Sequence, residues 1–211
     1  MGKNSLNISP SPLKEENSKG KLDVKVRLAR PEEWQKLRDF RFKIFDEDTE
    51  GNIASPRGIR KMKQRTDEEW KDAFFGKDIL TYEALVGSEI VCIGRIKKEK
   101  EIWYLFNLGT LKEFRGRHIA AKLTATRLNE IKVWGGKEVR AIIKKGRLIK
   151  KETKEGTIVV KKGNFESQEN AKSFGFKRVN TLYGYLRNLM VLDDVNNPIT
   201  TKRIEEILKE E

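Results

Sequence analysis

The stretch of sequence that decides the fold is TLKEFRGRHIA, at residues 110–120. It overlaps the end of a largely apolar segment, 102–111, which is typical of a strand at the centre of a sheet. A helix begins at its far end, and the free N–H groups of a helix N-terminus, with the helix dipole, attract phosphate. Arg115 and Arg117 add charge-assisted donors, and Gly116 lets a ligand approach the backbone closely. The stretch therefore predicts a pyrophosphate site between a strand and a helix.

Two other phosphate-binding motifs are excluded. The stretch lacks Gly-Lys-Ser/Thr, so it is not a P-loop, and it lacks both GxGxxG and a preceding βαβ unit, so it is not a dinucleotide fingerprint. The structural alternative is an ordinary basic helix start that binds nothing. Positive side chains at a helix N-terminus oppose the dipole, so the arginine pair favours a bound anion.

Hydrophobic periodicity around this stretch predicts an α/β fold, with a mixed central sheet flanked by helices. Strands are expected at 24–28, 80–86, 90–96, 102–111 and 138–143, with 177–192 forming one long strand or two bent ones. Helices are expected from Pro31, from a capping box at Thr66 and Glu69, from 119 to about 133, over 164–174, and from a cap at Thr200-Thr201.

We expect a single domain at residues 23–192, because a chain of 211 residues suits one substantial core. The segment at about 144–162 alternates like a β-hairpin and is interpreted as an insertion in this domain. Residues 1–22 are rich in Ser, Asn, Pro and Lys, which predicts a disordered tail. Residues 193–211 are expected to form a linker and a C-terminal helix.

The composition is polar and basic. Charged residues make up 36% of the chain, and 45 Lys and Arg against 32 Asp and Glu give a net charge of +13. Such a surface attracts phosphates, acidic peptides or nucleic acid. One Cys and one His exclude an internal disulfide and a Cys/His zinc site, so no metal is expected. Without a secretion signal or an apolar run of about 20 residues, we expect a soluble cytoplasmic protein.

Two segments of the sequence resemble motifs of the GCN5-related N-acetyltransferases (GNAT superfamily). The first motif, Arg/Gln-x-x-Gly-x-Gly/Ala, is matched by Arg115 and Ala120, with His118 where the middle Gly is usual. The second, Asn-x-x-Ala/Ser followed by Leu-Gly-Phe, is matched by NFES at 164–167 and FGF at 174–176. The expected element order also fits, so the resemblance covers roughly residues 24 to 190.

This resemblance implies that acetyl-CoA is the cosubstrate and that the acetyl group passes directly to an amine, without a covalent enzyme intermediate. It implies that the pyrophosphate lies on the backbone N–H groups of residues 115–120. It also implies that the pantetheine pairs with the splayed fourth strand and that an N–H near Thr110 or Leu111 polarises the thioester. The implied cofactor-binding residues are Leu108, Thr110, Leu111, Arg115, Gly116, Arg117, His118, Ile119, Ala120, Asn164 and Ser167.

The catalytic residues follow the family pattern less closely. Many relatives have a Tyr seven residues after the second-motif Asn, and Ala171 stands there in this chain. Tyr183 is our candidate for the acid that protonates the leaving thiolate, with Tyr185, Ser173 or water as alternatives. Glu83 is a candidate base, and Asn107 is a candidate for holding a catalytic water.

Two segments carry most of the net charge. Residues 53–66 have a net charge of +5, and residues 144–162 have +6. The functional hypothesis is that both flank an acceptor cleft for an acidic or phosphate-bearing amine, either a small molecule, a polypeptide or tRNA. The alternative is a solubilising surface. The C-terminal helix and the hairpin are candidate elements of a homodimer.

Three functions from different classes remain open at this stage. The first is an N-acetyltransferase, and the second is a CoA-binding module with weak or no turnover, which the Ala171 and Asn107 positions favour. The third is a basic RNA-binding protein. The chain lacks an RRM or KH signature, and its aromatics follow apolar periodicities rather than exposed stacking positions.

Overall fold

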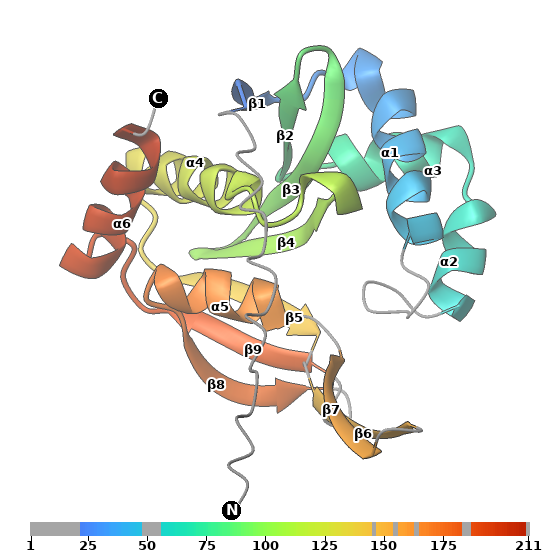
Figure 1. Ribbon diagram of the computed structural model, residues 1–211. Coiled ribbons are helices and arrows are strands. Elements are labelled where there is room, and N and C mark those ends of the chain that lie inside the picture. Colours follow the sequence, from blue (N-terminus) through green and yellow to red (C-terminus); the bar gives the residue numbers. More distant parts are fainter. Residues whose placement is uncertain are drawn as a thin grey trace, which may run out of the picture.

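The computed structural model describes residues 22–47, 56–144, 147–153, 156–162, 165–182 and 187–209. The predicted tail therefore lies outside the described residues, apart from residue 22. A seven-stranded sheet runs in the order β1-β2-β3-β4-β5-β9-β8 (Figure 1). Its strands are β1 (Val24–Leu28), β2 (Ile79–Val86), β3 (Glu89–Glu99), β4 (Ile102–Thr110), β5 (Val139–Lys144), β8 (Lys177–Leu182) and β9 (Arg187–Leu192).

Helices cover both faces of the sheet, which confirms the predicted α/β class. One core lies between the sheet and α4 (Ile119–Val133), α5 (Phe165–Ser173) and α6 (Pro198–Lys209). The other lies under α1 (Trp34–Glu47) and α3 (Asp67–Phe75), with α2 (Pro56–Lys63) beside them (Figure 1). The residue pattern of α2 indicates only a basic segment, and its helical structure was not predicted. Among the described residues, no helix is long and apolar enough to cross a membrane.

The ends of three helices test the sequence-based predictions. The capping box is confirmed, since Glu69 N–H donates to Thr66 Oγ1 (3.2 Å) and Thr66 N–H donates to Glu69 (2.8 Å). Gly135, at φ +71°, ends α4 as predicted. The predicted cap of the last helix is wrong: α6 begins at Pro198, and the side chain of Asn197 accepts from Thr200 N–H (2.9 Å).

The chain forms two antiparallel strand pairs after β5, and the sequence predicts them in part. The inserted hairpin is present as β6 (Arg147–Thr153) and β7 (Gly156–Lys162), which form a separate two-stranded sheet. The segment 177–192 contains two strands, β8 and β9, which pair antiparallel to each other. Because β9 also pairs antiparallel to β5, this part of the chain extends the sheet beyond its parallel β4–β5 junction.

Candidate functional site

The fourth strand opens away from the fifth halfway along its length. The parallel pairing of β4 with β5 covers only residues 103–105 of β4, whereas β5 stays paired with β9 as far as Lys144. A β-bulge begins where that pairing stops, with Asn107 in the left-handed conformation at φ +54°. From residue 106 onward β4 is therefore paired with β3 alone, through Phe106, Gly109 and Thr110. Such an edge can accept an extended ligand as an additional strand.

The end of β4 presents one backbone donor to this open edge. Leu111 N–H donates to the carbonyl of Val91 on β3 (3.0 Å), and bonding and non-bonding pairs alternate along antiparallel strands. The neighbouring pair, Thr110 with Cys92, therefore directs Thr110 N–H away from β3. Two N–H groups were expected to polarise a thioester, those of Thr110 and Leu111. The prediction for Leu111 is wrong, because its N–H already donates to Val91. The Leu111 side chain is fully buried. The N–H of Thr110 faces the open edge, and its role in polarising a thioester stays a prediction.

The N-terminus of α4 follows within ten residues of Thr110 and begins at Ile119. The first helical hydrogen bond runs from Lys122 N–H to the carbonyl of His118 (2.9 Å), so the N–H groups of residues 119–121 have no partner within the helix. His118 is the N-cap, at φ +58°, and its side chain makes no cap hydrogen bond. This left-handed backbone favours glycine, which is the residue usual at this position in the motif.

The loop before α4 is open to a ligand but differs from the expectation at one residue. The N–H of Arg115 donates to the carbonyl of Lys112 (3.2 Å) in a short 3-10 turn, η2 (Lys112–Phe114). The predicted contribution of that N–H to a pyrophosphate site is therefore wrong, and the N–H groups available begin at Gly116. Gly116 has φ +73° and open space where a Cβ would stand.

The two arginine side chains of this loop have different environments. Arg115 Nε donates to the carbonyl of Thr110 (3.1 Å), which links the loop to the end of β4. Arg117 lies against the ring of Phe114, at 6.0 Å from its centroid, and its Nε is buried without a hydrogen-bond partner. The first turn of α4 contains no acidic residue. An anion bound here would therefore meet positive charge and unpaired N–H groups together.

The second motif lies partly outside the described residues. Asn164 and Tyr183 are not described, so their predicted roles stay predictions. Ser167 lies on α5, and this helix is joined to α4 by a hydrogen bond from the Asn170 side chain to Thr124 Oγ1 (3.1 Å). Ala171, at the position of the tyrosine in many relatives, is buried in the core.

The structure separates the candidate base from the β4 edge. Glu83 lies on β2, two strands from β4 in the row Glu83–Ile93–Gly109. Its side chain is fully buried, and its Oε1 lies 2.5 Å from Nη2 of Arg27. Burial raises the pKa of Glu83, although Arg27 opposes that shift. The geometry favours an ion-pair role for Glu83 over its predicted role as the base.

The bulge residue Asn107 has a partner that the sequence analysis missed. With its amide oriented to accept, Asn107 receives hydrogen bonds from Nε (3.3 Å) and Nη2 of Arg95 on β3. Arg95 is buried, and no sequence signal distinguishes it from the many surface arginines. This contact fixes the Asn107 side chain on the α1/α3 face of the sheet.

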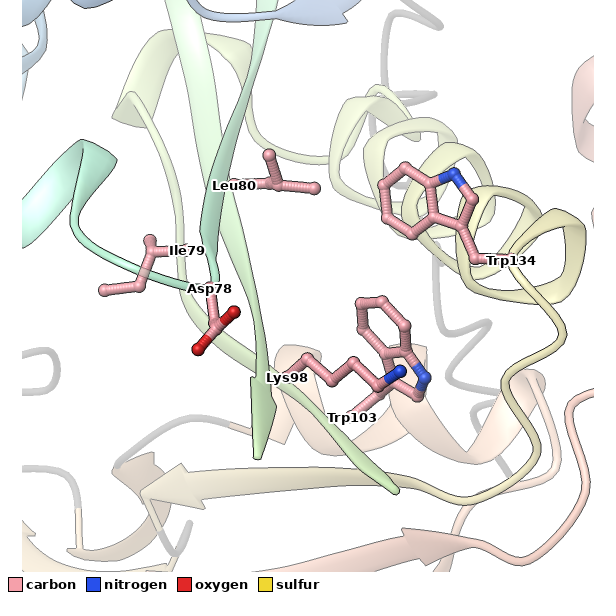
Figure 2. Close-up of a pocket in the computed structure, with 6 residues that line it drawn as sticks. All are labelled: Asp78, Ile79, Leu80, Lys98, Trp103 and Trp134. Atoms are coloured by element: carbon pink, nitrogen blue, oxygen red, sulfur yellow. The ribbon is translucent and has the colours of Figure 1, made fainter. Parts of the chain in front are cut away.

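A pocket lies at the C-terminal end of α4, beside Trp134 (Figure 2). Its volume is about 310 Å³, and its lining includes Asp78, Lys98, Trp103 and Trp134. The two indole rings stack at 5.5 Å between centroids, and the Lys98 ammonium lies 5.3 Å from the Trp103 ring.

Within the described part of the chain, no group of three or more His, Cys, Asp or Glu side chains is arranged to hold a metal ion.

Solved structures of GNAT-family acetyltransferases have this arrangement of sheet and helices over about four fifths of the chain. The chain has this fold, which confirms the resemblance at the level of the fold. No protein-family model matches the sequence, and no curated protein sequence matches it.

Solved structures of acetyltransferases share the architecture over most of the chain. The PaiA N-acetyltransferase of Thermoplasma acidophilum, in complex with coenzyme A, has a TM-score of 0.62 at 17% identity and covers 82% of this chain and 99% of its own. A GNAT-family acetyltransferase of Streptococcus pneumoniae has a TM-score of 0.57 at 15% identity, covering 80% and 98%. The ribosomal-protein-S18-alanine N-acetyltransferase of Escherichia coli has 0.53 at 8% identity, covering 83% and 97%.

Proposed function

We propose that this protein is an acetyl-CoA-dependent N-acetyltransferase. The observation that carries the proposal is the continuous path from the unpaired edge of β4 to the uncapped N-terminus of α4. The path offers backbone hydrogen bonding to an extended amide chain and then an anion site, which is the order of pantetheine and pyrophosphate in acetyl-CoA. The neighbours in fold include N-acetyltransferases, among them the PaiA enzyme with coenzyme A bound.

The residues present fit this cosubstrate. The N–H groups from Gly116 to Ala121 and the buried Nε of Arg117 would hold the pyrophosphate. Residues 106–110 would pair with the pantetheine amides, and Ser167 on α5 and Asn164 would border the same arm. Acetyl-CoA, when bound, supplies an activated acetyl thioester.

We assign Thr110 N–H the role of polarising the thioester oxygen, because it is the donor at the end of β4 that faces away from β3. A direct transfer to the amine agrees with the environment of Cys92. This thiol is buried, burial raises its pKa to about 11, and it accepts a hydrogen bond from Thr110 Oγ1 (3.2 Å). A thiol in that state is a poor nucleophile, so catalysis rests on positioning.

The second candidate is a CoA-binding module without turnover. The observation that favours it is Ala171, which packs in the core at the position where many relatives have a proton-donating Tyr. Both candidates require acetyl-CoA binding. They differ in whether thiol is released when an amine is added.

The test is a thiol-release assay with a panel of amines, run with the wild type and with Tyr183→Phe. We expect amine-dependent release of free coenzyme A, and a lower rate for Tyr183→Phe if Tyr183 protonates the leaving thiolate. Tyr104→Phe, on β4 where it pairs with Arg140 of β5, is the matched control. Binding of acetyl-CoA without release for any amine in the panel would favour the inactive module.

A further inference from the structure

Three arginines gather on the α1/α3 side of the sheet. Arg41 lies on α1, Arg65 just before α3, and Arg95 on β3. Arg41 and Arg95 are buried, with 5% and 8% of their surface exposed, whereas Arg65 is exposed. Their positive charges are close enough to act on one another: burial, together with the neighbouring arginines, lowers the pKa of Arg95 to about 9 and that of Arg41 to about 10.

No carboxylate among the described residues pairs with this arginine cluster. Burying a charge costs free energy unless the charge is paired, and the chain pairs its buried Glu83 with Arg27 in this way. The buried Arg127 also has partners on all three of its nitrogens: Leu123 O, Arg95 O and Thr124 Oγ1. Arg41 differs from both, because its buried Nη1 has no hydrogen-bond partner and its guanidinium has no ion-pair partner among the described residues, whereas Glu83, whose oxygens also lack hydrogen bonds, has the ion pair with Arg27.

Aromatic rings and the amide of Asn107 contact some of the guanidinium groups in the cluster. Arg95 lies 4.7 Å from the ring of Phe106 and 5.5 Å from that of Phe74, and it donates to the carbonyl of Ala73 and to Asn107. The guanidinium of Arg41 lies 4.7 Å from the ring of Phe45. Ring faces attract cations but provide no acceptor for Nη1 of Arg41.

The cluster borders the β4 bulge, which directly precedes Thr110, the proposed thioester contact. A Cβ at Gly109 would stand 3.9 Å from Nη1 of Arg41, and Gly109 directly precedes Thr110. Asn107, the bulge residue, is held by Arg95. The unpaired buried donor is thus adjacent to the strand segment that positions the thioester.

We propose that the cluster of Arg41, Arg65 and Arg95 binds an anionic group, a carboxylate or a phosphate, carried by the amine acceptor. This inference rests on the proposed function and deepens it by naming the acceptor class. The bound anion accepts from Nη1 of Arg41 and replaces the missing counter-charge. Arg65, exposed at the outer side of α3 and 5.2 Å from the ring of Trp70, meets the anion first, and the buried pair holds it.

The first test measures thermal unfolding of the protein saturated with coenzyme A, so that phosphate cannot act at the α4 N-terminus. Succinate and inorganic phosphate are each compared with chloride at equal ionic strength, since a ligand that binds only the folded state raises the unfolding temperature. Wild type is expected to be stabilised, and Arg41→Met is expected to lose that effect. The anion that gives the larger shift identifies the carboxylate or the phosphate as the source.

The control variant is Arg38→Met, on the same helix, whose guanidinium pairs with Asp39 and Asp67. It should keep the anion effect. Arg41→Met should also unfold at the same or a higher temperature than wild type in chloride, because it removes an uncompensated buried charge. A lower temperature in chloride, with the anion effect intact, would make Arg41 a structural residue and overturn the proposal.

The second test compares amines in matched pairs, glycine with glycinamide and O-phosphoethanolamine with ethanolamine, by thiol release. The anionic member of a pair should be preferred, and Arg41→Met should raise its KM about tenfold while the Kd for acetyl-CoA stays unchanged. Equal use of both members, or an unchanged KM, overturns the inference but not the proposed function. Failure of the wild type to bind acetyl-CoA overturns the proposed function, and the anion titration is then repeated in Arg117→Gln without coenzyme A.

Discussion

Nε of Arg115 donates to the carbonyl of Thr110 at 3.1 Å. This bond joins the end of β4, where the proposed thioester contact lies, to the loop that opens α4, where the proposed pyrophosphate site lies. Thr110 thus directs its N–H toward the open edge while its carbonyl is held by a side chain from the anion site. The two halves of the proposed cosubstrate site are held in a fixed relation by this one side chain.

Arg115→Met tests that link. The variant keeps the length of the side chain but removes the bond to Thr110, and we expect kcat to fall more than the affinity for acetyl-CoA. The reason is that the backbone N–H groups of residues 116–121, which are proposed to hold the pyrophosphate, are unchanged. Steady-state kinetics with calorimetry separates the two quantities. A variant that loses affinity while kcat is kept would contradict the positioning role of Arg115.

Gly109→Ala tests the close packing under the bulge. A Cβ at this position would stand 2.8 Å from Cδ1 of Ile44, which is fully buried. We expect a loss of about 1–3 kcal/mol in the free energy of unfolding, as for other overpacked cores. Ile44→Val removes the clashing methyl group, so the double variant should recover part of this loss. Additive losses in a urea double-mutant cycle would contradict the predicted clash.

His118→Gly tests whether the only histidine acts through its backbone. An L-residue in the left-handed conformation costs about 1–2 kcal/mol, and His118 has φ +58°. We expect His118→Gly to be at least as stable as wild type and to keep its acetyl-CoA affinity and kcat. His118→Val should be less stable. A large loss of kcat in His118→Gly, with affinity kept, would instead give the imidazole a catalytic role.

Glu83→Gln tests the buried carboxyl group through pH. Because burial raises the folded-state pKa above the ordinary 4.5, the folded protein binds this proton more tightly than the unfolded chain. At pH values below the pKa of Glu83 in the unfolded chain, the carboxyl is protonated in both states and its raised pKa does not lower the free energy of unfolding. As the pH rises above that pKa, the free energy of unfolding falls. The stability of Glu83→Gln relative to wild type should improve between about pH 4 and pH 7. Urea unfolding at both pH values checks this.

The opposite trend in Glu83→Gln would mean that the ion pair with Arg27 outweighs the cost of burial. We also expect this variant to keep most of its kcat, because Glu83 lies two strands from β4. A steep loss of kcat/KM with a changed pH profile would restore Glu83 as the general base.

The sequence was sufficient to predict the elements that carry strong local signals. The capping box at Thr66, the glycine stop after α4 and the change from strand to helix between residues 110 and 119 all depend on signals that are local in the sequence. The errors have a different origin. The N–H groups of Leu111 and Arg115 are occupied because of strand register and a 3-10 turn, which residue types alone do not specify.

Long-range contacts explain what the sequence analysis missed. Nothing in the sequence distinguishes Arg41 and Arg95 from the exposed basic residues. They are buried only because α1 and α3 pack on β3. Glu83 was a candidate because its strand position was anticipated, but its pairing with Arg27 depends on the β1–β2 register. The count of charged residues therefore shows that the protein is basic, but it does not show which arginine side chains are buried.

The most direct test of the central claim is a calorimetric titration of acetyl-CoA into wild type, Arg117→Gln and the control Arg57→Gln on α2. Arg117 has a buried, unpartnered Nε beside the α4 N-terminus, whereas Arg57 is exposed. We predict that wild type and Arg57→Gln bind equally and that Arg117→Gln binds about tenfold more weakly, a loss of about 1.4 kcal/mol. Absence of binding by the wild type, or equal binding by all three proteins, would contradict the proposed site.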